Sequence, residues 1–124
     1  MRLKYSAFCL LVIFGAVDAQ AQITRFGDDV NAAIDAGINW LDGRGVFANP
    51  SPAGNGAGLV ALALLERPES ADQRAVARGY ANASPADQQK IERIMTYVIN
   101  RSNDAFYSYR NGSSMMALAV YLRT

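Results

Sequence analysis

The chain has 124 residues and a formal net charge of +1, from 12 basic and 11 acidic residues, with one cysteine and no histidine. The lack of histidine excludes Ser-His-Asp and Cys-His nucleophile systems and the usual zinc sites, so we expect no metal ion and no cofactor. A nearly neutral chain without a basic run has no electrostatic footprint for nucleic acid, and we expect no nucleic-acid partner.

The first 21 residues follow the order of a secretory signal peptide. A short basic start precedes an apolar run at residues 7–17, and Ala19-Gln20-Ala21 is a small-x-small cleavage pattern. We expect cleavage after Ala21, a secreted or periplasmic location, and no membrane span after removal of the signal, since the run is too short to span a bilayer comfortably. The alternative is an N-terminal membrane anchor. Residues 22–124 would then form one small domain without cysteine.

An amphipathic helix is predicted to begin near Val30, with Asp28 or Asp29 as its N-cap, and to stop before Gly43 and Gly45. The residues that recur at helical spacing on its apolar face are Val30, Ile34, Ile38 and Leu41. Since other faces carry Asn and Asp, the pattern indicates a helix that buries one side only.

The next segments alternate between loops and apolar helix. Residues 46–57 contain two prolines and two glycines, which predict a loop. Residues 58–66 are apolar on every side and predict a helix that is buried all round, closed by Pro68. The polar stretch that follows favours a short helix from Ser70 to Arg78.

The second half of the chain repeats this order. Ser84, Pro85 and Asp87 are strong helix-start residues, and they predict a second amphipathic helix over residues 85–100. Residues 103–112 are expected to be loop. The last apolar helix is expected to begin after a cap at Ser113 or Ser114.

An internal repeat links the two halves. GAGLVALALLER at residues 56–67 aligns without a gap with GSSMMALAVYLR at residues 112–123, and the amphipathic helices align too, with Ile34 matching Ile91 and Trp40 matching Tyr97. Repeats of this length indicate stacked helical hairpins, so the predicted fold is all-α with two consecutive hairpins. Trp40 and Tyr97 are expected to pack between repeats. Because the last helix lacks a neighbour on one side, residues 22–124 alone are predicted to be marginal, molten or self-associated through that helix.

The segments AIDAGINWLDGRG, GNGAGLVALALLE and FYSYRNGSSMMALAVYL resemble the α/α toroid of squalene and terpene cyclases and protein prenyltransferase β subunits. The resemblance is closest to secreted bacterial proteins with prenyltransferase/squalene-oxidase-type repeats, and it covers residues 29–124. It implies alternating inner and outer helices around a barrel. A complete toroid holds more than two hairpins, so we expect the N-terminal portion of a longer protein. The alternative is a small protein that completes its core by self-association.

The resemblance implies a fold without an activity. The cyclases' Asp-x-Asp-Asp motif is absent, since Asp28-Asp29 lacks the pattern, and the prenyltransferase zinc site needs a histidine and a cysteine that residues 22–124 lack. We assign no catalytic residue. The first hypothesis is a secreted, non-catalytic module that binds an unknown ligand or protein partner. The alternative is the N-terminal part of a toroid-type enzyme, cyclase-like or acting on a polysaccharide, whose catalytic acids lie in further repeats.

The aromatic segment before the last helix holds the candidate binding residues. Rings beside guanidinium and amide groups can hold a sugar, an isoprenoid or a peptide. The candidates are Asp104, Tyr107, Tyr109, Arg110 and Asn111. Both tyrosines are equally compatible with core packing, and Phe106 is expected to be core. Met115 and Met116 are expected to fill the core of the last helix. Asp42 and Asp104, at equivalent places in the repeats, are expected to be solvated helix ends rather than an acid–base pair.

Overall fold

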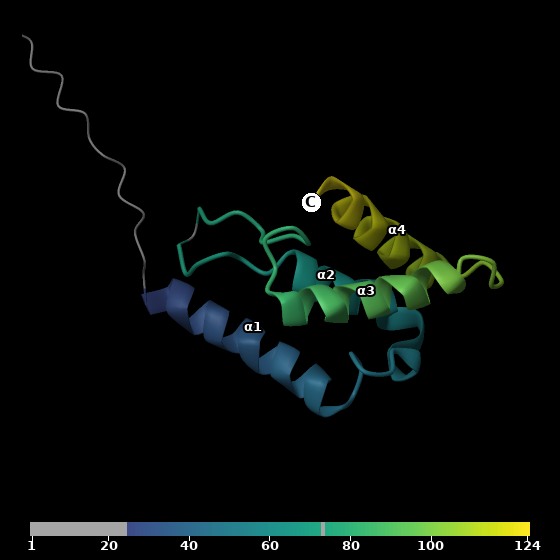
Figure 1. Ribbon diagram of the computed structural model, residues 1–124, viewed down its shortest axis with the longest axis horizontal. Helices are drawn as coiled ribbons and strands as arrows, with labels where there is room; N and C mark the ends of the chain where they lie inside the picture. The colour runs from purple at the N-terminus through teal and green to yellow at the C-terminus, as the bar shows by residue number, and fades with distance from the viewer. Residues whose placement is uncertain (1–24, 73) are drawn as a thin grey trace, which may run out of the picture.

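The computed structural model describes residues 25–124 except Gln73, and the predicted signal peptide lies outside these residues. The described part is built of helices, which confirms the all-α prediction. Its elements in chain order are α1 (Arg25–Gly43), the 3-10 helix η1 (Ser51–Gly56), α2 (Ala57–Leu65), α3 (Pro85–Asn100) and α4 (Ser108–Arg123). In Figure 1, α1 and α3 run in one direction, and α2 and α4 run back in the other. No helix in the described ranges is long and apolar enough to cross a membrane.

Helix α2 is the centre of the molecule. It packs most extensively against α4 and then against α3, whereas α1 meets it along a short line. A Cβ atom added at Gly58 would lie 2.5 Å from the backbone carbon of Ser113, so the α2 and α4 backbones approach each other as closely as glycine allows. The buried core residues are Ile38, Val46, Phe47, Ala57, Ala61, Leu64, Leu65, Ala83, Ile91, Ile94, Met95, Val98, Ala117 and Val120.

The bounds predicted for α3 are confirmed, because its start is encoded locally. The Ser84 hydroxyl oxygen accepts a hydrogen bond from the Asp87 backbone N–H at 3.2 Å, and Pro85 occupies the first turn. The apolar face of α3 consists of Ile91, Ile94, Met95 and Val98, all buried. Helix α3 therefore has a complete cap and a fully covered face.

Helix α1 was predicted as a helix, but its predicted start was wrong. It begins at Arg25 rather than near Val30, so Asp28 lies within its first turn instead of capping it. An acidic residue there still stabilises the positive end of the helix dipole. The predicted stop is confirmed, since α1 ends at Gly43 and Gly45 adopts a positive φ of 72°. The loop predicted over residues 46–57 contains η1.

The short helix predicted over residues 70–78 was wrong. The Asp72 side chain accepts a hydrogen bond from the Arg74 backbone N–H at 2.9 Å, and Pro68 pairs with Ala77 in an isolated β-bridge. Short acidic and hydroxyl side chains offer the backbone partners of this kind, which compete with the helical pattern. Residues 66–72 and 74–84 instead belong to a folded connection between the two halves of the chain.

The predicted start of α4 was also wrong, because the helix begins at Ser108 and not after Ser113 or Ser114. Ser113 is buried, and its hydroxyl donates to the Arg110 carbonyl oxygen at 3.1 Å within the helix. A buried serine that bonds back to the preceding turn is a helix-interior residue rather than a cap.

Exposure on α4 and α2 corrects three further expectations. Met115 and Met116 are 70% and 61% exposed, so they do not fill the core, and the preceding Phe106 is 81% exposed. Leu59 on α2 is exposed as well, so α2 is not buried all round. The two methionines and Leu59 lie on helix faces that no other described element covers, and Phe106 lies in the segment before α4.

Trp40 does not pack between the repeats. It is exposed on α1, where the Arg44 guanidinium lies 5.0 Å from its ring centroid. Its counterpart Tyr97 is half-buried on α3 and its hydroxyl accepts a hydrogen bond from Arg101 at 3.0 Å. Matching residues in the two repeats therefore have different surroundings.

The connection before α3 is tied to the C-terminal end of α4. The Tyr80 backbone N–H donates to the Thr124 hydroxyl at 3.1 Å, and the rings of Tyr80 and Tyr121 meet edge to face at 5.2 Å. The Tyr80 hydroxyl also donates to the Glu92 carboxylate, and this bond raises the pKa of Tyr80 above its ordinary value. The connection is thus held in place by contacts with α3 and α4.

Candidate functional site

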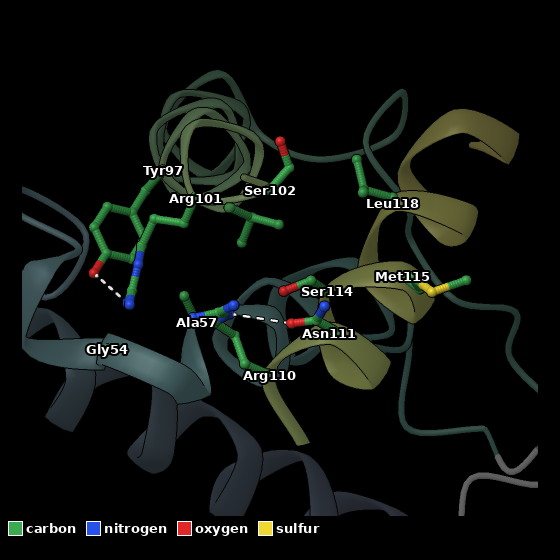
Figure 2. Close-up of a pocket in the computed structure, with 11 residues that line it drawn as sticks. Gly54, Ala57, Tyr97, Arg101, Ser102, Arg110, Asn111, Ser114, Met115 and Leu118 are labelled. Carbon is green, nitrogen blue, oxygen red and sulfur yellow. Dashed lines mark hydrogen bonds between the residues drawn. The ribbon is translucent and has the colours of Figure 1, made fainter. Parts of the chain in front are cut away.

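A cavity of about 150 Å³ opens where the N-terminal ends of α2 and α4 meet the C-terminal end of α3. Figure 2 shows α4 residues Asn111 and Ser114 across the cavity from α3 residues Tyr97 and Arg101. The lining residues are Gly54, Ala57, Tyr97, Val98, Arg101, Ser102, Arg110, Asn111, Ser114, Met115 and Leu118. Three helix ends therefore bring polar and apolar side chains to one place.

Arg101 comes from the end of α3, one turn after Tyr97. Its Nε donates to the Asp104 carboxylate at 2.6 Å, and its Nη1 donates to the Tyr97 hydroxyl at 3.0 Å. Both hydrogen bonds favour the charged form, Asp104 more strongly, and they raise the pKa of Arg101 above its ordinary value. Within the described residues its Nη2 has no hydrogen-bond partner, and this lining residue therefore keeps a free donor.

Arg110 is the more deeply buried of the two cations, with 10% of its side chain exposed. Its Nη1 lies 3.5 Å from the Asp104 carboxylate, its Nε donates to the Asn111 side-chain oxygen at 3.2 Å, and its Nη2 donates to the Ala105 carbonyl oxygen. These hydrogen bonds tie the first turn of α4, which begins at Ser108, to the segment before it.

The charges around the cavity do not cancel. Arg101 and Arg110 both bond to Asp104, and no acidic side chain lines the cavity. One carboxylate offsets one of the two cations. The N-termini of α2 and α4 add positive partial charge, because neither has a side-chain cap, while the C-terminal end of α3 works in the opposite sense.

The apolar part of the lining comes from all three helices. Ala57 of α2, Val98 of α3 and Leu118 of α4 face the cavity, whereas Figure 2 shows the end of the Met115 side chain extending away from it. A lining that combines a few convergent polar groups with apolar walls is typical of small-molecule sites.

The structure separates the five predicted binding residues. Arg110 and Asn111 line the cavity, and Asp104 bonds to both arginines from outside the lining. Tyr107 and Tyr109 are exposed and lie outside the lining, with their ring centroids 6.4 Å apart.

The sequence analysis missed the α3 side of the cavity. Tyr97, Arg101 and Ser102 lie at the end of that helix. Ser114, on the α4 side, was predicted only as a possible cap of the last helix. Residues four apart share one helix face, so the Tyr97–Arg101 spacing carried a usable signal.

The remaining candidates form no site. Asp42 pairs with Lys90 at 2.8 Å, whereas Asp104 pairs with Arg101. The two carboxylates therefore contact different cations and do not form an acid–base pair. Residues 25–124 outside Gln73 contain no cluster of metal-ligating side chains.

The sequence matches no model of a known protein family, and neither a curated protein nor a solved structure is significantly similar to it. The functional assignment therefore depends on the residues of the cavity and on the packing of the helices.

Proposed function

We propose that the chain is an exported helical-repeat module that binds, without transforming it, a small molecule with one anionic group and an apolar part. The observation that carries this proposal is the shared carboxylate: Arg101 and Arg110 face the cavity but have only Asp104 between them. A bound carboxylate would restore charge balance and accept hydrogen bonds from guanidinium donors.

The volume limits the size of the ligand. An apolar cavity of roughly 150 Å³ accommodates a molecule of about the size of benzene. Ala57, Val98 and Leu118 supply walls for such a group, and the unpaired Nη2 of Arg101 supplies the donor for the anion. We therefore expect a small aromatic or short-chain carboxylate.

The wider setting of the module is also part of the proposal. The antiparallel succession of α1 to α4 supports a pair of hairpins from an α/α toroid, with α2 and α4 as inner helices (Figure 1). The basic and apolar residues before Ala19-Gln20-Ala21 support export. N-terminal sequencing of the protein recovered from outside the cytoplasm tests the export step, and an N-terminus at Gln22 is expected.

Titration with benzoate, followed by two-dimensional amide NMR, tests ligand binding. We expect saturable shifts at the amides of Ala57, Asn111 and Ser114, with a Kd of about 1 mM, corresponding to about −4 kcal/mol. Benzyl alcohol has the same ring without the charge and should bind at least about tenfold more weakly, a loss of about 1.4 kcal/mol.

Arg101→Gln should weaken benzoate binding to the level of benzyl alcohol. The matched control is Arg93→Gln, because Arg93 lies on the exposed face of the same helix, outside the lining. Melting curves of both variants separate loss of binding from loss of fold. Equal binding of benzoate and benzyl alcohol, or an unchanged Kd for folded Arg101→Gln, would show that the cavity does not select anions.

A further inference from the structure

A second, larger hollow lies near the other end of α2. It is a groove of about 560 Å³ between α1 and the C-terminal half of α2. Its α1 wall is formed by Ile34, Gly37, Ile38, Leu41 and Trp40. Its α2 side holds Ala63, Glu66 and Arg67, and the charge of Arg67 is already paired with Asp35. The groove is mainly apolar, and it contains the single tryptophan of the chain.

The internal repeat shows what kind of element covers such a face. Ile34, Ile38 and Leu41 of α1 correspond in sequence to Ile91, Met95 and Val98 of α3. In α3 these residues are buried, mainly against the apolar helix α2. The α1 face has the same pattern, but within the described residues α2 meets it only along a short line, which leaves Ile34 and Leu41 half-exposed.

Helix α4 also carries an apolar stripe that no other described element covers. Met116, Ala119 and Leu122 of α4 are exposed, and Leu122 is 81% exposed. Helix α4 is the sequence counterpart of α2, although it would dock through a different face, because its equivalent residues Ser113, Ala117 and Val120 are already buried. The stripe ends at Arg123, the one charged residue after Arg110.

We infer that the α1–α2 groove binds the α4 stripe of a second copy of this chain, in a head-to-tail contact. The apolar stripe would cover Ile34 and Leu41, and Arg123 would lie near Glu66. Neither charge has an ion-pair partner among residues 25–124 outside Gln73, so the complementarity is available to a second copy. A contact between two different surfaces forms a ring or an open chain rather than a symmetric pair. This inference does not depend on the anion site.

Sedimentation velocity across the micromolar to millimolar range tests self-association, with Trp40 fluorescence as a report on the groove. The sedimentation coefficient should rise with concentration, and the emission should move to shorter wavelength as the exposed ring becomes buried. A protein that stays monomeric throughout the range would overturn the inference.

Two charge variants locate the contact. Leu122→Glu alters the exposed stripe, and Gly37→Glu places a carboxylate in the groove, where an added Cβ meets nothing within 4 Å. Each should raise the Kd of association at least tenfold, which is about 1.4 kcal/mol. Gly37→Ala is the matched control and should associate like the parent protein. Melting curves of all three variants must show intact folding.

Mixing the two glutamate variants gives the decisive result. In a head-to-tail contact, Gly37→Glu retains a good stripe and Leu122→Glu retains a good groove, so an equimolar mixture should form a one-to-one dimer. Suppose instead that Leu122→Glu prevents association, that Gly37→Glu does not, and that the mixture forms no mixed dimer. Then α4 binds α4 and the groove is not the docking surface. Association of Gly37→Glu as tight as that of Gly37→Ala would overturn the inference in the same way.

Discussion

The two halves of this chain, α1 with α2 and α3 with α4, have similar sequences and different environments. Ile34 of α1 and Ile91 of α3 occupy matching places in the repeat, yet Ile91 is fully buried and Ile34 only partly. Helices α2 and α4 differ in the same way, since α2 packs against both α3 and α4, while no other described element covers one face of α4. An apolar pattern defines which face can be buried, and the neighbouring elements determine whether it is. Three sets of substitutions test this difference between the two halves of the chain.

The largest effect is expected where α2 and α4 touch. Gly58→Ala would place a Cβ 2.5–2.6 Å from the backbone atoms of Ser113 and Ser114, so the helices must move apart. Overpacking of this kind should lower the free energy of unfolding by about 3 kcal/mol, measured by urea denaturation. The control is Gly112→Ala on α4, where an added Cβ meets nothing within 4 Å and alanine should stabilise the helix by up to about 1 kcal/mol. Equal effects of the two substitutions would contradict the close crossing.

The next largest effect is expected from a direct comparison of α1 with α3. Ile91→Ala removes a fully buried side chain and should cost about 3 kcal/mol, whereas Ile34→Ala, at the half-open groove, should cost about 1 kcal/mol. Urea denaturation at low protein concentration measures both. If the costs are the same, α1 is as well covered in solution as α3.

The smallest effects are expected at the starts of α3 and α4. Ser84→Ala removes the cap of α3 and should cost about 1 kcal/mol, while Ser84→Asp keeps an acceptor and should retain most of the stability. Helix α4 begins after Tyr107, which has extended backbone angles and no side-chain cap, so Tyr107→Ser should add up to about 1 kcal/mol. Thermal or urea denaturation checks the signs. A loss on Tyr107→Ser would mean that the ring contact with Tyr109 outweighs a new cap.

These differences explain which parts of the fold the sequence could predict. The start of α3 depends on Ser84, Pro85 and Asp87, which are adjacent in sequence, and its bounds were right. At the start of α4, Arg110 bonds to Asp104 and Ala105, contacts that no helix rule contains, and this start was predicted six or seven residues late. Met115 and Met116 were predicted to be core because they lie in an apolar segment. Their burial would need another element packed against that face of α4, and no described element lies there.

The candidate site was predicted in part for the same reason. Arg110 and Asn111 were found because they follow an aromatic segment, and they do line the cavity. The tyrosines that drew attention to the segment lie outside the lining. Arg101 was missed because its importance comes from sharing Asp104 with a residue on another helix, and that pairing is visible only in three dimensions.

The contacts between residues 79–81 and the end of α4 set an order of events during folding. The hydrogen bond from Tyr80 to Thr124 spans 44 positions, and α2 finds its main partners, α3 and α4, only later in the chain. Contacts between distant residues slow folding, because a long loop must close before they form. While the chain is being synthesised, α1 and α2 therefore remain without the main packing partners of α2. We expect α2 and the connection to gain protection from hydrogen exchange together with α4, in a single late step.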